Sequence, residues 1–312
     1  MQILDICTVL LYIDMKNINW KAYISVIGAM VFWSLSFIWS KQALEHYGPL
    51  TVLFSRLVLA SVALLSVSRL LGKLNIIAKK DWKYFLMLSF FEPFLYFIGE
   101  TFGLQRVSPT IASVIVSTIP LFLPIVGYYI FKEKFTFFKV FGTVLSFVGV
   151  ILVIIDYNMD LNADFWGVLL LFIAVFSGVA YTTLVHRLSD NYNSFTIVGW
   201  QSVIGAISFM PLFLFFEMEE TIHTGFVWES VLPILKLGLF ASIFAFVLYT
   251  YSIKELGVTK AGVFSNVIPV FVSIISFFLF SERLLIINYF GIFIVVGGLY
   301  VSQVKRKGGV MS

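Results

Sequence analysis

The sequence has little of what a water-soluble protein usually contains. Charged residues make up 12% of the chain, against roughly 25% in a typical soluble domain. Cys7 is the only cysteine, which excludes an intramolecular disulfide and any Cys-x-x-Cys metal or redox site. Proline is scarce and runs of charge are short, so disordered, collagen-like and low-complexity chains are excluded as well.

Apolar residues, by contrast, are too numerous for a soluble fold. Hydrophobic residues make up 60% of the 312 positions, and the mean hydropathy is +0.99. One soluble core of this length could not hide so much apolar surface from water. The sequence therefore predicts an all-α integral membrane protein with ten transmembrane helices, each long enough to cross a bilayer. The predicted spans are 22–44, 50–72, 82–104, 110–131, 137–155, 165–186, 194–216, 231–253, 260–280 and 285–303.

The basic residues indicate membrane orientation rather than a nucleic-acid partner. Sixteen of the 21 Lys and Arg residues fall on the side of the spans that holds both termini, and three fall on the other side. Positive charge accumulates on the cytoplasmic side of a membrane. We therefore expect a multi-pass protein of the cytoplasmic membrane, surrounded by the lipid bilayer, with both termini in the cytoplasm.

The chain repeats itself at about half its length. A shift of 149 residues gives twelve identities in forty positions, including Pro120 with Pro269, and a weaker match at 145 pairs Arg56 with Gln201. Each half then holds five helices, and an odd number places the halves in opposite orientations. We predict two inverted five-helix repeats, at 20–156 and 163–303. An N-terminal extension (1–19) and a basic cytoplasmic tail (304–312) flank them. An over-extended start would explain the extension, and an interfacial segment is the alternative.

An ordered set of residues resembles the EamA family of the drug/metabolite transporter superfamily. The set comprises Trp33, Phe37, Lys41, Pro49, Arg56, the stretch 112–120, and the glycine pairs Gly142/Gly149 and Gly291/Gly298. The resemblance covers about 20–303. It implies a central cavity lined by both halves, with helices five and ten packed at the periphery, where the glycines allow close contact. It also implies transport of small metabolites, commonly the export of amino acids or related compounds.

The chain departs from that family at Ser34, where glycine is frequent, and in the two acidic residues of its third helix, Glu92 and Glu100. An ionisable side chain inside hydrocarbon costs about 2.5 kcal/mol or more, so it normally faces a cavity or a partner. Eight residues apart, the two carboxyls lie on one face of a helix. They could carry protons in a coupled transport cycle, or one could pair with Arg56 to hold two helices together. Arg56 could instead bind a substrate carboxylate.

Proline and aromatic residues indicate where a cavity would lie. Pro93, Pro120 and Pro269 each remove a helical hydrogen bond, and the freed carbonyls can serve a ligand or a neighbouring helix. Ser117 and Asn266 stand three residues before the paired prolines and offer polar groups to a ligand or to another helix. For the aromatic residues near this region, a pocket wall competes with lipid contact and core packing. They are Trp33, Phe37, Tyr96, Tyr181, Trp200 and Tyr249.

Motifs of enzymes and metal sites are absent from the sequence. It contains no His-Glu-x-x-His zinc motif, no Gly-x-Ser-x-Gly nucleophile elbow and no phosphate-binding loop, and its three histidines are never at ligand spacing. We therefore predict a secondary transporter with no cofactor and no enzymatic activity. It would export small metabolites or amino-acid-like amphipathic solutes by alternating access, with proton coupling as one alternative. A non-transporting scaffold or channel is the rival function, and an intramembrane transferase is a weaker one.

The substrate is expected to be a small molecule without a phosphate group. A phosphate or nucleotide-sugar carrier would need clustered Lys and Arg at mid-membrane, and Arg56 alone is too little. A neutral, zwitterionic or cationic solute is therefore favoured. The oligomeric state is open, with a homodimer as one alternative.

Overall fold

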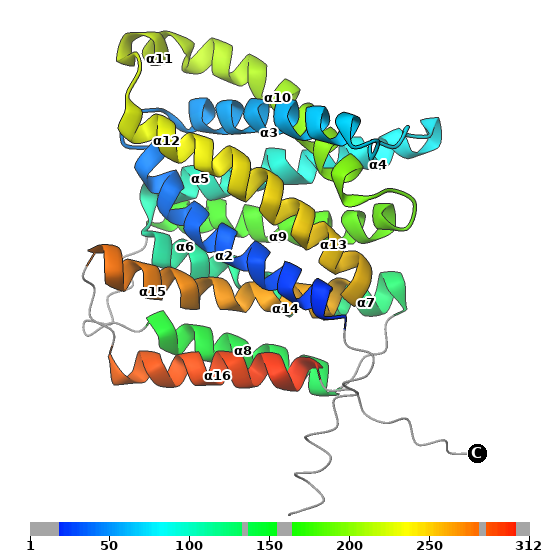
Figure 1. Ribbon diagram of the computed structural model, residues 1–312. Helices are drawn as coiled ribbons and strands as arrows, with labels where there is room; N and C mark the ends of the chain where they lie inside the picture. Colours follow the sequence, from blue (N-terminus) through cyan, green and yellow to red (C-terminus); the bar gives the residue numbers. More distant parts are fainter. Residues whose placement is uncertain (1–18, 133–136, 155–163, 281–284, 304–312) are drawn as a thin grey trace, which may run out of the picture.

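The computed structural model describes residues 19–132, 137–154, 164–280 and 285–303, and every regular element in those ranges is helical. The helices run across Figure 1 as a bundle. The predicted N-terminal extension up to residue 18 and the predicted tail from residue 304 lie outside the described residues.

The first half of the chain supplies the helices that begin the bundle. They are α2 (Trp20–Ala43), α3 (Pro49–Leu70), a short helix (Lys79–Asp81), α4 (Trp82–Ser89), a π-helical turn (Phe90–Leu95), α5 (Tyr96–Arg106), α6 (Pro109–Val116), α7 (Ile119–Phe131) and α8 (Phe137–Ile154).

The second half supplies a similar series. It consists of α9 (Phe165–Ser189), α10 (Ser194–Phe216), α11 (Met218–Thr224), α12 (Trp228–Lys236), a π-helical segment (Leu237–Ala245), α13 (Phe246–Leu256), α14 (Val258–Val263), a 3₁₀ turn (Phe264–Val267), α15 (Ile268–Phe280) and α16 (Ile286–Gln303).

The apolar composition of these helices suits a bilayer. Within the described ranges, eight helical stretches are long and apolar enough to cross a membrane, and α8 and α16 contain shorter apolar stretches. Six of the predicted spans overlap one helix each among the described residues, and the other four, at 82–104, 110–131, 231–253 and 260–280, overlap interrupted runs of two or three helical segments. Polar side chains start several of them, since the side chains of Asn19, Asp164 and Asn193 each accept a hydrogen bond from a backbone N–H in the first turn.

Helices are interrupted near each of the three predicted prolines. Glu92 has extended backbone angles (φ −147°, ψ 117°) inside the π-helical turn that separates α4 from α5, next to Pro93. Helices α6 and α7 are separated just before Pro120, and the 3₁₀ turn separates α14 from α15 just before Pro269. Each of these prolines lacks the backbone N–H that a helical hydrogen bond needs, which fits a break at its position. Proline alone does not decide a break, since Pro124, Pro211 and Pro233 lie inside α7, α10 and α12.

Helices α8 and α16 form a pair at one side of the bundle (Figure 1). Their backbones touch, since a Cβ atom at Gly142 would clash with the backbone N of Ser302, and one at Gly298 would clash with that of Ser146. Glycine is needed there because no side chain fits between the two backbones. The close packing expected from the glycine pairs is present, and it keeps α8 and α16 together at the periphery.

Helices α3 and α10 pack along each other and are joined at both ends. At the α3 N-terminus, the Glu217 carboxylate accepts hydrogen bonds from Leu50 N (3.1 Å), Thr51 N (2.8 Å) and Thr51 Oγ1 (2.9 Å). At the α10 N-terminus, Thr196 Oγ1 accepts a hydrogen bond from Asn75 N (2.8 Å) and donates one to the carbonyl of Lys73 (3.2 Å). Each helix start is thus bound to the chain that follows the other helix.

Two tyrosines join the loops at these same ends. The Tyr47 hydroxyl donates to the Gly225 carbonyl (2.8 Å) and accepts from Val227 N (3.1 Å). The Tyr192 hydroxyl donates to Asp81 Oδ2 (2.8 Å) and accepts from Ala78 N (3.1 Å). The shorter of the two sequence shifts relates Tyr47 to Tyr192, and both make the same kind of contact. Equivalent tyrosine hydroxyls therefore join the loops at both ends of the bundle.

Candidate functional site

A cavity lies in the middle of the bundle and offers about 50 Å³ to the centres of water-sized spheres, which is room for a few water molecules. Its wall comes from several helices of both halves of the chain. The lining residues are Trp33, Ser36, Phe37, Arg56, Glu92, Tyr96, Phe97, Glu100, Val116, Ile119, Gly178, Tyr181, Thr182, Phe246, Tyr249, Ser265 and Ile268.

Arg56 is the cation of this wall and is almost fully buried. Its Nε donates a hydrogen bond to Ser242 Oγ at 2.9 Å, and its guanidinium carbon lies 4.2 Å from the centre of the Phe97 ring. Within the described part of the chain, no carboxylate oxygen lies within 4.0 Å of the guanidinium. The Arg56–glutamate salt bridge considered from the sequence is therefore not formed, and the rest of the guanidinium fork stays available to a ligand.

Glu92 and Glu100 both line the cavity, but they do not share one face of a regular helix, because Glu92 has extended backbone angles in the turn before α5. They are 5% and 7% exposed, and they interact electrostatically with each other and with Arg56. The Tyr96 hydroxyl lies beside Glu100, and neither carboxyl forms a salt bridge among the described residues. A buried carboxylate without an ion-pair partner is costly, which makes this cluster a candidate site for a proton or a bound solute.

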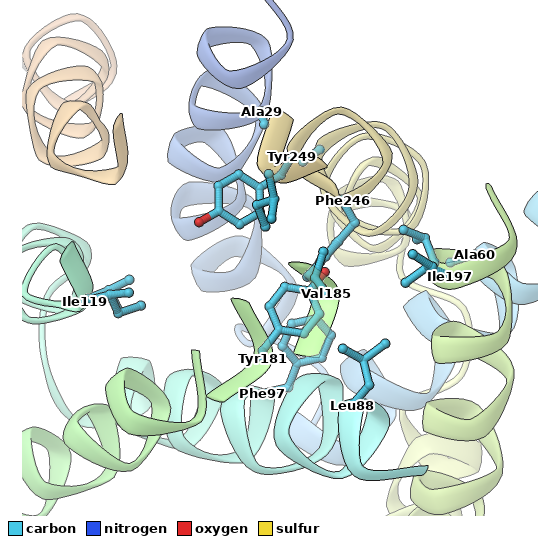
Figure 2. Close-up of a cluster of buried hydrophobic side chains, with 14 of the residues drawn as sticks. Ala29, Ala60, Leu88, Phe97, Ile119, Tyr181, Val185, Ile197, Phe246 and Tyr249 are labelled. Carbon is cyan, nitrogen blue, oxygen red and sulfur yellow. The ribbon is translucent and has the colours of Figure 1, made fainter. Parts of the chain in front are cut away.

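Aromatic rings close much of the remaining wall. Trp33 packs edge-on against Phe246 and Tyr249, with ring centres 5.2 and 4.9 Å apart. Tyr181 meets Phe246 in the same manner at 5.8 Å. Figure 2 shows Phe97, Tyr181 and Phe246 gathered between their helices. The cavity therefore combines an apolar wall with a charged cluster, an arrangement suited to an amphipathic solute.

The lining residues are related by the two sequence shifts. Fourteen of the seventeen form seven pairs at one shift or the other. At 145 the pairs are Trp33/Gly178, Ser36/Tyr181 and Phe37/Thr182, and at 149 they are Phe97/Phe246, Glu100/Tyr249, Val116/Ser265 and Ile119/Ile268. The three lining residues without a lining counterpart are Arg56, Glu92 and Tyr96. The paired wall is thus contributed equally by both halves, while its charge comes from the first.

The structure brings most of the predicted site residues together. Eight of them line the cavity: Arg56, Glu92, Glu100, Trp33, Phe37, Tyr96, Tyr181 and Tyr249. Trp200 does not, because its ring packs edge-on against Trp82 at 5.1 Å. Ser117, Pro120, Asn266 and Pro269 are also absent from the wall. Ser117 Oγ donates to the carbonyl of Val114 (2.6 Å), and the Asn266 amide is buried without a hydrogen-bond partner among the described residues.

The interrupted helices reach the cavity one position away from the predicted residues. Val116 and Ile119 line it where Ser117 and Pro120 were expected, and Ser265 and Ile268 replace Asn266 and Pro269. The other lining residues that the sequence analysis missed are Ser36, Phe97, Gly178, Thr182 and Phe246. The shift of 145 relates the first, third and fourth of these to the predicted residues Tyr181, Trp33 and Phe37 and would have found them. Phe97 and Phe246 are related only to each other, so the shift could not have found them.

The described residues contain no cluster of three or more His, Cys, Asp or Glu side chains that could hold a metal ion. The titratable groups of the cavity are the two glutamates, Arg56 and three tyrosines. These groups can bind and orient a solute and can exchange protons with it.

Comparison with known proteins gives one consistent group of relatives. The model of the EamA-like transporter family matches residues 20–155 and again residues 165–303. The uncharacterized transporter YetK of Bacillus subtilis is 26% identical over 292 residues, covering 92% of this chain and 88% of the relative. An uncharacterized transporter of Archaeoglobus fulgidus is 27% identical over 286 residues, covering 92% of this chain and 100% of the relative. One solved crystal structure shares the fold at a TM-score of 0.73 and 15% identity, covering 90% of this chain and 97% of the other.

Proposed function

Because the chain belongs to the EamA-like transporter family, we propose that it is a secondary transporter that exports a small amphipathic solute by alternating access. The observation that carries this proposal is the central cavity, whose paired wall is shared equally by two sets of equivalent positions. A site of this kind can face either side of a membrane if one half rocks against the other. The related proteins named as transporters support the general activity.

The proposed architecture is ten spans arranged as two inverted repeats, at 20–156 and 163–303. The seven lining pairs, the paired helix breaks and the two tyrosine contacts support it. The basic residues support an orientation in the cytoplasmic membrane with both termini in the cytoplasm. In that orientation Tyr192 lies at the cytoplasmic end and Tyr47 at the outer end.

The solute is proposed to be neutral, zwitterionic or cationic, such as an amino acid or a related compound. Glu92 and Glu100 together carry more negative charge than Arg56 offsets, which disfavours an anion in the cavity. The aromatic wall would cover the apolar part of the solute. Proton coupling is proposed to act through the two glutamates, because a proton on one carboxyl balances the charge of the cluster when no solute is bound.

The test compares the media of cells that produce three versions of the protein. The first is the wild type and the second is Ser36→Phe, which places a ring in the cavity. The third is Ile207→Phe, a matched ring insertion at a position that is 62% exposed on the outside of α10. The wild type and Ile207→Phe should enrich the same solute in the medium, and Ser36→Phe should not. Identical media from all three would reject export through this cavity.

Uptake of that solute into everted membrane vesicles then measures transport directly. Export from cells corresponds to accumulation inside everted vesicles. Accumulation in right-side-out vesicles instead would show an importer, and flux that never exceeds passive equilibration under any ion gradient would favour the channel alternative.

A further inference from the structure

Buried polar atoms without a hydrogen-bond partner are unevenly distributed in the bundle. Among the described residues, the side chains that contain such atoms are Ser68, Ser89, Ser146, Tyr181, His186, Trp200, Gln201, Thr250 and Asn266. Most of them lie between the cavity and the end of the bundle where the α9–α10 loop joins residues 73–81. We call this the Tyr192 end. Unpaired buried polar groups are rare in folded proteins, so a cluster of them needs an explanation.

Three of these side chains meet at the cavity wall. Tyr181 on α9, Gln201 on α10 and Thr250 on α13 are 1%, 3% and 0% exposed, and their three helices pack on one another. Gln201 and Thr250 lie close enough to the Tyr181 hydroxyl to interact with it. None of the three groups completes a hydrogen bond of good geometry among the described residues. Tyr181 faces the cavity, while Gln201 and Thr250 lie behind it.

Gln201 also occupies a position equivalent to a residue of the cavity. The shorter sequence shift relates it to Arg56, and both stand at the same distance from the start of their helices, α10 and α3. Arg56 has a hydrogen-bond partner in Ser242 and faces the cavity, whereas Gln201 Oε1 is closed off without a partner among the described residues. When two equivalent halves move against each other so that the cavity opens to the other side of the membrane, each position takes on the environment that its equivalent position had before. Gln201 would then face the cavity as Arg56 does now.

We infer that Tyr181, Gln201 and Thr250 form a second polar subsite, closed in this structure, that binds an uncharged hydrogen-bonding group of the solute when the Tyr192 end opens. This inference rests on the proposed function, because it assumes that the Tyr192 end opens during transport. The three side chains are neutral, so they offer hydrogen bonds without selecting for charge. Tyr181 separates the subsite from the cavity and must move when the solute passes.

The first test measures whether water-soluble reagents reach the subsite. Cys7→Ser removes the single cysteine, and Gln201→Cys and Thr250→Cys are introduced into that background separately. The probe is a small cationic methanethiosulfonate reagent applied to reconstituted protein. Val198→Cys on α10 and Ile253→Cys on α13 are matched controls, because both positions are as deeply buried as the subsite. We expect the two subsite cysteines to react at least about tenfold faster than the controls, since a pathway must hydrate as it opens.

The second test does not depend on whether the cysteine variants fold. It uses substitutions that preserve the size of the side chain. Gln201→Met and Thr250→Val replace the unpaired polar groups by apolar ones of similar volume. If these groups lack partners in the closed protein, both variants should melt at or above the wild-type temperature in detergent. A lower melting temperature for both would show that the groups are already bonded in the closed state and would overturn the inference.

The outcomes separate this inference from the proposed function. Subsite cysteines that react no faster than Val198→Cys and Ile253→Cys, while the Cys7→Ser parent protein exports its solute, reject the subsite and leave the function intact. Failure of both the wild type and the Cys7→Ser parent to export any solute, with reactive subsite cysteines, rejects the solute role of the subsite together with the proposed function.

Discussion

The two halves of the chain build the same cavity wall but contribute unequally to its chemistry. The first half places Arg56, Glu92 and Glu100 there. The equivalent positions of the second half, at the same two sequence shifts, are Gln201, Ala241 and Tyr249, and all three are buried and uncharged. Both halves therefore provide the shape of the cavity wall, and only the first half provides its charged residues.

This difference shows what a duplicated membrane protein has to keep in both copies. Helix length, breaks and close contacts determine whether a half can pack in the bilayer, so both halves retain them. A charge inside hydrocarbon is costly, and one shared cavity needs only one charged cluster. The second half could therefore lose or never acquire its charges without losing its fold.

Of the substitutions that compare the two halves, removal of one carboxyl should have the largest effect. Glu92→Gln keeps the size and hydrogen-bonding capacity of the side chain but cannot titrate, so uptake driven by a pH gradient should fall by at least about tenfold while solute counterflow persists. Ala241, the position equivalent to Glu92, has no polar group to remove, so the comparison in the second half is Tyr249→Phe at the equivalent of the other carboxyl, Glu100; it should leave gradient-driven uptake within a few-fold of the wild type. The measurement is uptake of the exported solute into proteoliposomes with and without the gradient.

An opposite pattern would change the assignment. Unchanged gradient-driven uptake in well-folded Glu92→Gln protein would exclude Glu92 as the obligatory proton site and leave Glu100 as the candidate. Loss of protein yield and of every activity together would instead show a structural role for Glu92.

The peripheral helices should behave alike in the two halves. Gly149 on α8 and Gly298 on α16 are equivalent, and a Cβ atom at either would collide with backbone atoms of the other helix. Gly149→Ala and Gly298→Ala should each cost about 1–3 kcal/mol of stability, the usual cost of overpacking. Gly297→Ala is the control, because nothing lies within 4 Å of a Cβ atom there. Thermal unfolding in detergent measures all three, and equal melting temperatures for Gly297→Ala and Gly298→Ala would contradict the packing argument.

Substitution of the threonines near the starts of α3 and α10 should reveal a smaller difference in stability between the two halves. Thr51 and Thr196 are equivalent by the shorter sequence shift, but Thr51 Oγ1 donates to the Glu217 carboxylate whereas Thr196 Oγ1 donates to a backbone carbonyl. Hydrogen bonds to a charged group contribute about 1.5–3 kcal/mol and neutral ones about 0.5–1.5 kcal/mol. Thr51→Val should therefore lower the melting temperature more than Thr196→Val. The reverse order would show that the carboxylate does not strengthen this contact.

The sequence predicted the parts of this molecule that a bilayer constrains directly. A span needs about 20 apolar residues, so the helices could be located, and a buried charge is costly, so Glu92, Glu100 and Arg56 could be selected. It could not tell which face of an apolar helix meets the cavity, because lipid and cavity wall both accept apolar side chains. One residue rotates about 100° around a helix, and the breaks in α6–α7 and α14–α15 shift that rotation. Val116 and Ser265 therefore line the cavity in place of Ser117 and Asn266.

The smallest expected effect compares Tyr47 with Tyr192, the equivalent tyrosines that close the two ends. Each hydroxyl makes one donated and one accepted hydrogen bond, so Tyr47→Phe and Tyr192→Phe should each cost about 1 kcal/mol at neutral pH. Asp81 makes the Tyr192 end different. Burial, together with the hydrogen bond donated to Asp81, raises the pKa of the Tyr192 hydroxyl above its ordinary value.

A raised pKa in the folded protein gives the Tyr192 contact a definite pH dependence. The unfolded chain loses the phenolic proton near pH 10, before the folded protein does, so the stability contributed by this group is complete below about pH 10 and declines above it. The wild type should therefore melt above Tyr192→Phe at pH 8, and this difference should narrow at about pH 10.5. The other tyrosines are present in both proteins and cancel in the difference. A gap that widens with pH would show that the folded protein stabilises the ionised Tyr192, which would contradict both its burial and its donation to Asp81.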